Sequence, residues 1–94
     1  MTYLVLLSYQ YPNGLGFNHL IYPKLKANLW LNPDQVFPFT IDKILSNQGF
    51  IMPNTQAEIT LITSTHEVLP TDTIYEWGLD FTPIGKAKII HLLP

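Results

Sequence analysis

Eight prolines are distributed along the 94 residues of this chain, and they limit what the chain can fold into. Proline fixes φ and removes a backbone donor, so prolines at this spacing leave little room for long helices. The segments between them are short and rich in isoleucine, leucine, threonine and aromatic residues, which favour strands. The pattern therefore predicts an all-β fold. The prolines are Pro12, Pro23, Pro33, Pro38, Pro53, Pro70, Pro83 and Pro94.

Alternation of apolar and polar residues predicts six strands in a single domain. The alternation is cleanest in residues 56–64, where Ala57, Ile59 and Leu61 share one face. Residues 40–46 also fit a short capped helix, although a strand is favoured there. A closed antiparallel barrel suits six short, apolar strands better than an open sheet, because closure removes exposed edges. The expected strands cover residues 2–9, 26–31, 35–44, 56–64, 74–81 and 84–92, with turns at 32–34 and 53–54 and a break at Thr82-Pro83.

Charge is scarce in this sequence, and its composition narrows the classes of partner. Charged residues make up 13% of the chain, the net charge is −2, and all five basic residues are lysines. Arginine is the usual bidentate ligand of phosphate and of guanine edges, so its absence argues against nucleic acid as the partner. A neutral surface favours a protein partner or self-association instead. Cysteine is absent, which excludes disulfides and thiolate metal sites.

No segment approaches the roughly 18 apolar residues that a membrane-spanning helix requires. The apolar run at residues 3–7 is too short for the central region of a signal peptide, and no basic segment precedes it. We therefore expect a soluble cytoplasmic protein that does not contact membranes.

Seven short motifs follow one another along the chain. They are Leu6-Leu7-Ser8, the glycine and histidine loop Gly14–His19, Tyr22, Leu29-Trp30-Leu31, Met52-Pro53-Asn54-Thr55 with the strand Gln56–Ile62, Thr65-His66-Glu67, and Ile84–Ile89. In their order and spacing the chain resembles, from about residue 3 to residue 92, the C-terminal β-barrel domain (domain III) of translation elongation factor Tu. The resemblance implies a six-stranded antiparallel barrel standing alone, and contacts with translation components or with a toxin or factor that recognises such a barrel.

The sequence departs from that family where the family binds tRNA. The arginine of the glycine and histidine loop is missing, and so is the arginine-rich run before the last strand, where Leu79–Pro83 stands instead. Asp80 in that run would repel a phosphate. A phosphate-binding glycine loop with its lysine is also absent. The resemblance therefore carries the fold to this chain but not tRNA or GTP binding.

Catalytic chemistry has weak support in the sequence. His66 beside Glu67 is the best acid–base pair, on a polar loop of the kind that often carries sites. Neither a nucleophile nor an oxyanion-binding loop accompanies them, and His91 is expected to be a packed or rim residue of the last strand. The histidines lack metal-ligand spacing. We expect a non-catalytic protein with no cofactor and no metal; a small enzyme built on His66 and Glu67 is the least favoured alternative.

The candidate binding residues lie on one strand and one loop. Trp30 shares a strand face with Lys26 and Asn28, opposite three apolar residues, so it is expected to point outward and to anchor a protein partner. The loop of residues 11–19, with Phe17 and His19, is expected to contribute to the same surface. Trp77, in contrast, is expected in the core. A weak RNA-binding barrel using Lys86, Lys88 and the aromatic loop is the alternative, and steep salt dependence would reveal it.

Overall fold

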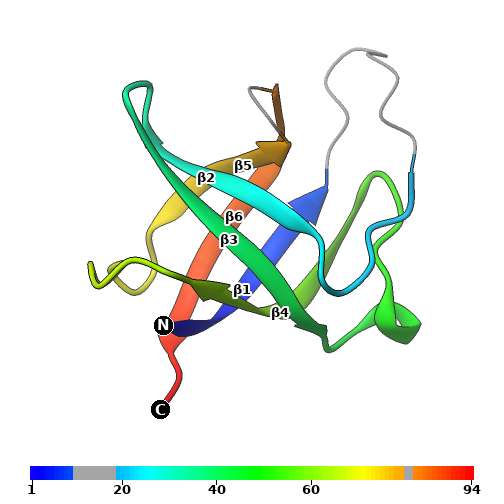
Figure 1. Cartoon of the computed structure of the whole chain (residues 1–94). Coiled ribbons are helices and arrows are strands. Elements are labelled where there is room, and N and C mark those ends of the chain that lie inside the picture. Colours follow the sequence, from blue (N-terminus) through cyan, green and yellow to red (C-terminus); the bar gives the residue numbers. More distant parts are fainter. Residues whose placement is uncertain (10–18, 80–81) are drawn as a thin grey trace.

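The computed structural model describes residues 1–9, 19–79 and 82–94, and its strands form a closed antiparallel barrel in the order β1-β4-β3-β2-β5-β6 (Figure 1). This confirms the predicted all-β, six-stranded antiparallel barrel. None of the described segments forms a helix of the length and apolar character that crossing a bilayer requires. The strands are β1 (Thr2–Tyr9), β2 (Lys26–Asn32), β3 (Gln35–Ile44), β4 (Thr55–Thr63), β5 (Ile74–Leu79) and β6 (Thr82–Leu92), and a 3₁₀ turn, η1, spans Asn47–Gly49.

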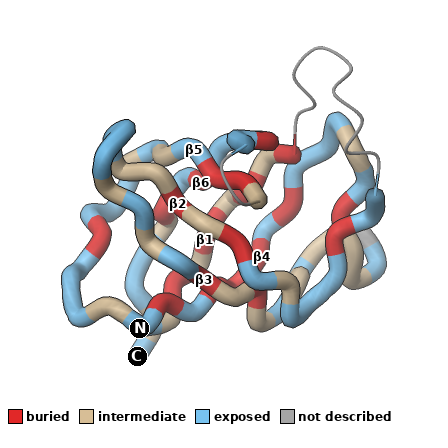
Figure 2. Tube along the Cα trace, turned by 45° about the horizontal axis from the view of Figure 1, so that its top comes forward, coloured by how far each residue is buried: buried red, intermediate tan, exposed pale blue. Residues whose placement is uncertain are grey.

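The core lies inside the barrel and consists mainly of every second side chain of each strand. Buried and more exposed residues alternate along β1, β2 and β6, as the tube in Figure 2 shows, whereas in β4 Thr60 is buried together with its neighbours Ile59 and Leu61. The predicted faces of the second, fourth and last strands are confirmed, because Ala27, Leu29, Ala57, Ile59, Leu61, Ala87 and Ile89 are all buried.

Two sequence predictions concerned strand boundaries. Residues 40–44 continue β3, so the favoured strand is confirmed and the helix alternative is wrong. The predicted break at Thr82-Pro83 is also wrong, since both residues belong to β6 and Pro83 pairs with Gly78. Proline is tolerated there because the pairing between β6 and β1 extends no further than Gly85, so that among the described residues only β5 pairs with the chain at Pro83.

Trp77 is fully buried in the core, as predicted. Its ring packs edge-on against Tyr9 and Phe39, with centroid separations of 6.2 and 6.3 Å. Its indole Nε1 donates a hydrogen bond to the carbonyl oxygen of Ser8 at 2.8 Å. Gly85 leaves the space for this contact, because a Cβ there would lie 1.8 Å from the Ser8 carbonyl oxygen and 2.5 Å from Nε1. The hydrogen bond from Trp77 to Ser8 therefore requires a glycine at position 85.

Leu69 is buried although the sequence places it in a polar loop. Its backbone N–H donates to the hydroxyl of Tyr3 at 3.0 Å, and the same hydroxyl lies 3.5 Å from the carbonyl oxygen of Glu67. Tyr3 is itself fully buried in β1. The hydroxyl of Tyr3 therefore links the loop of residues 65–73 to the core.

Replacing Tyr3 with phenylalanine is expected to destabilise the barrel by about 1–2 kcal/mol, because the buried Leu69 N–H loses its acceptor while the ring is kept. Urea denaturation measures the loss, and exchange of the Leu69 amide with solvent should accelerate. Tyr75→Phe is the matched control, since no hydrogen bond involves the Tyr75 hydroxyl in the described part of the chain, and it should change stability by less than about 0.5 kcal/mol. Equal effects of the two substitutions would contradict this role of Tyr3.

Candidate protein-binding surface

Lys26, Asn28 and Trp30 point to the outside of the barrel from alternate positions of β2, as predicted, and we call these three side chains the β2 face. Lys26 is exposed, while Asn28 and Trp30 are half-buried. Ala27 and Leu29 between them are buried in the core. Side chains in a strand point alternately to its two faces. Because Ala27 and Leu29 point into the core, Lys26, Asn28 and Trp30 must point outward.

Strand pairing surrounds Trp30 with apolar side chains from both neighbouring strands. Val36 of β3 and Glu76 of β5 lie directly opposite it. Val36 is 39% exposed and Ile74, two residues before Glu76, is 61% exposed. Trp30, Ile74 and Pro83 line one hollow of about 420 Å³ together with Glu76. A half-buried tryptophan beside exposed aliphatic side chains is the composition of a protein-contact surface.

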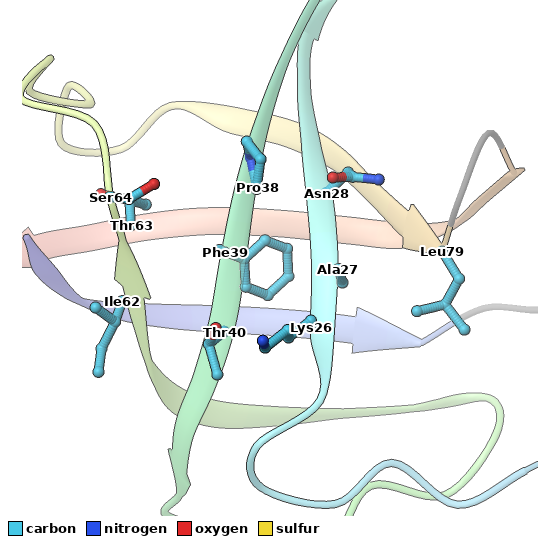
Figure 3. A pocket seen from close by; sticks show the side chains of 10 residues that line it. All are labelled: Lys26, Ala27, Asn28, Pro38, Phe39, Thr40, Ile62, Thr63, Ser64 and Leu79. Atoms are coloured by element: carbon cyan, nitrogen blue, oxygen red, sulfur yellow. The ribbon is translucent and has the colours of Figure 1, made fainter.

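A second and larger hollow, of about 610 Å³, lies over the other end of the β2 face. Figure 3 shows Ile62 and Leu79 at its opposite sides, with Lys26 and Asn28 between them. Among the described residues that line it, Lys26 is the only charged one. Its lining residues are Lys26, Ala27, Asn28, Pro38, Phe39, Thr40, Ile62, Thr63, Ser64 and Leu79.

The two loop residues predicted for this surface are not brought to it by any observed contact. Phe17 lies outside the described residues. His19 is exposed, and its carbonyl oxygen accepts a hydrogen bond from the Tyr9 hydroxyl at 3.0 Å. This hydrogen bond links His19 to β1. In the barrel order β1 lies between β4 and β6, so it is not adjacent to β2. Among the described residues, the β2 face is therefore built from strand residues.

The candidates for acid–base and RNA chemistry are all exposed. His66 and Glu67 lie on the loop after β4, and neither lines the two hollows described above. His91 is exposed on β6, in agreement with a rim position. Lys86 forms an ion pair with Glu76 at 3.1 Å, whereas Lys88 is exposed. Within residues 1–9, 19–79 and 82–94, no cluster of three or more histidine, aspartate or glutamate side chains forms a possible metal site.

A second exposed apolar surface was not predicted from the sequence. The buried residues Ile21 and Ile51 form an isolated antiparallel bridge, with N–H to O distances of 2.9 Å in both directions. Because side chains alternate along extended backbone, their neighbours turn outward. In this second apolar surface Tyr22 and Met52 are 56% and 52% exposed. The centroid of the Tyr22 ring lies 6.2 Å from that of the Phe50 ring. Only the pairing of two distant loops reveals it. Its members are Leu20, Tyr22, Phe50 and Met52.

No protein-family model, curated protein or solved structure matches this chain. The similarity to the elongation factor Tu domain therefore stays a prediction drawn from short motifs. The properties of the barrel have to be argued from its own side chains.

Proposed function

We propose that this barrel is a non-catalytic protein-binding module that contacts its partner through the β2 face and the exposed aliphatic residues beside it. The observation that carries the proposal is the position of Trp30, which is half-buried on the outside of the barrel between Val36 and Ile74. Tryptophan gives a large contact area for little loss of conformational entropy, so it commonly anchors interfaces.

Electrostatics supports a protein partner over RNA. The chain has a net charge of −2 and no arginine. Lys86, one of the two lysines considered for RNA binding, lies against the carboxylate of Glu76. Binding through apolar contacts depends weakly on salt, whereas binding to phosphates weakens steeply as salt rises. The resemblance to the elongation factor domain suggests a translation component, or a toxin or factor that recognises this type of barrel, as the partner.

Affinity capture from a cell lysate tests the proposal with matched double variants. Trp30→Ser with Lys26→Glu removes the tryptophan anchor and reverses the charge of the β2 face. Met52→Ser with Lys43→Glu is the control, because it makes comparable changes at exposed positions elsewhere on the barrel. We expect the wild type and the control to capture the same protein and the β2-face variant to lose it, at ~50 mM and at ~200 mM salt alike.

Thermal unfolding should show that both double variants remain folded. Capture of RNA at the lower salt only would favour the RNA-binding alternative. Retention of the partner by the β2-face variant, or its loss from the Met52 and Lys43 control, would contradict the proposed surface.

A further inference from the structure

β3 is longer than its neighbour β4, and this difference leaves part of its edge open. Pairing with β2 covers β3 from Gln35 to Thr40, whereas pairing with β4 begins only at Phe39. Residues 35–38 therefore have a strand on one side and, among the described residues, none on the other. We call this unpaired side of residues 35–38 the β3 edge.

The direction of the backbone groups on the β3 edge follows from one hydrogen-bonded pair. Ile41 donates to the carbonyl of Leu25 at 2.9 Å and accepts from the N–H of Lys24 at 2.7 Å, so its backbone groups face the β2 side. In an antiparallel ladder this direction alternates from residue to residue, and the register between β2 and β3 is unbroken from Thr40 to Val36. The N–H and C=O of Val36, and the C=O of Pro38, therefore face the open side.

Pro38 explains why the pairing with β4 stops where it does. The register that places Phe39 opposite Thr63 would place Pro38 opposite Ser64 as the next hydrogen-bonded pair. Proline has no N–H to donate there, and the backbone of Ser64 forms no hydrogen bond with it. Beyond this point the chain leaves the barrel wall, and Pro38, Thr63 and Ser64 line the 610 Å³ hollow between the two strands (Figure 3).

We infer that the β3 edge binds an extended segment of a partner protein, which adds to the barrel as an antiparallel strand where β4 would continue. The segment gains three backbone hydrogen bonds, two with Val36 and one to the carbonyl of Pro38. Its middle side chain faces the barrel interior beside half-buried Phe37, which favours an apolar residue, and the two flanking side chains lie outside beside Val36 and Pro38. This mode of recognition is β-strand addition. It rests on the proposed function and specifies how the partner binds.

A second copy of the chain fits the β3 edge less well than a partner segment. In a symmetric antiparallel pairing centred on Val36, each Pro38 would face Asp34 of the other copy. The Asp34 N–H already donates to the Asn32 side-chain oxygen at 2.9 Å, so only the two hydrogen bonds between the Val36 residues would remain. Because the Val36 N–H is the one donor of the β3 edge, the edge favours short partner segments and limits pairing between two copies of the chain.

Nuclear magnetic resonance titration tests the inference with the uncharged peptide acetyl-Thr-Val-Thr-Val-Thr-amide as the probe. In the free protein the Val36 amide should exchange quickly with solvent, and saturating peptide should slow this exchange at least ~10-fold. Shift changes should centre on residues 35–38 and 63–64. Val36→Pro removes the edge N–H together with the valine side chain and should abolish these changes. The control Val36→Ala also removes the valine side chain but keeps the N–H, and should retain them. Thermal unfolding checks that both variants fold.

Three results would overturn the inference. The first is the absence of saturable shifts at peptide concentrations up to ~5 mM. The second is an unchanged response of Val36→Pro, which would place the peptide elsewhere. The third is a concentration-dependent dimer with a protected Val36 amide in the absence of peptide, which would assign the edge to a second copy.

The failure of this inference is distinguishable from failure of the proposed function. If the Trp30 and Lys26 double variant loses the captured partner while Val36→Pro keeps it, the β2 face stands and the edge is wrong. If no protein is captured but the peptide binds Val36, the edge is available to extended chains and the β2-face proposal fails.

Discussion

Gly85→Ala is expected to destabilise the barrel by at least about 3 kcal/mol, at the upper end of over-packing costs in protein cores. The reason is geometric. The new Cβ would lie 1.8 Å from the Ser8 carbonyl oxygen, which belongs to the neighbouring strand and cannot rotate away as a side chain would. Strands β1 and β6 would have to separate, and the hydrogen bond from Trp77 to Ser8 would be lost with them.

Urea denaturation and thermal unfolding measure this effect, and the midpoint temperature should fall by more than about 12 °C. Gly49→Ala is the matched control. Gly49 has a φ of +88° but no atom within 4 Å of the added Cβ, so alanine there should cost only about 1–2 kcal/mol of backbone strain. A Gly85→Ala variant as stable as Gly49→Ala would show that β1 and β6 are not as close as the structure has them.

Trp77→Phe is expected to cost about 2–3 kcal/mol, because it leaves a cavity between Tyr9 and Phe39 and removes the Nε1 donor. Trp30→Phe is the same chemical change on the outside of the barrel and should cost less than about 0.5 kcal/mol. The chain contains only these two tryptophans, so the fluorescence of each variant reports on the one that remains. Emission from Trp77 alone should be blue-shifted relative to emission from Trp30 alone.

The same pair of variants separates stability from binding. Trp77→Phe should keep the captured partner as long as the barrel is folded, whereas Trp30→Phe should weaken capture without changing stability. Equal losses of stability from the two substitutions would contradict the inward position of Trp77 and the outward position of Trp30.

Local patterns in the sequence predicted the strands and their faces well. The alternation around Ala57 and Leu61 identified the buried side of β4, and the position of Trp30 between Leu29 and Leu31 identified the outward side of β2. Such patterns are local because side chains in a strand alternate with a period of two, whatever the partner strands are.

Features that depend on pairing between distant segments could not be predicted in the same way. The sequence predicted a break at Thr82-Pro83 because proline commonly ends strands, yet Pro83 lies in a part of β6 that pairs, among the described residues, with β5 alone. The segment of residues 65–73 was predicted to be a polar loop, yet Leu69 within it is buried, and its backbone N–H donates to the hydroxyl of Tyr3, 66 residues away. The apolar surroundings of Trp30 likewise require the registers of β2 with β3 and with β5.

The position of β1 between β4 and β6 has a consequence for how the chain folds. The two hairpins β2–β3 and β5–β6 join strands that are close in sequence, whereas β1 pairs with residues 55–62 and with residues 85–92. Closing such long loops is entropically costly, so folding is expected to be slow for a domain of this size. During synthesis, β1 lacks one of its two neighbouring strands in the barrel until β6 has been made. Until then its apolar inner side, including Val5 and Leu7, needs protection from other unfolded chains.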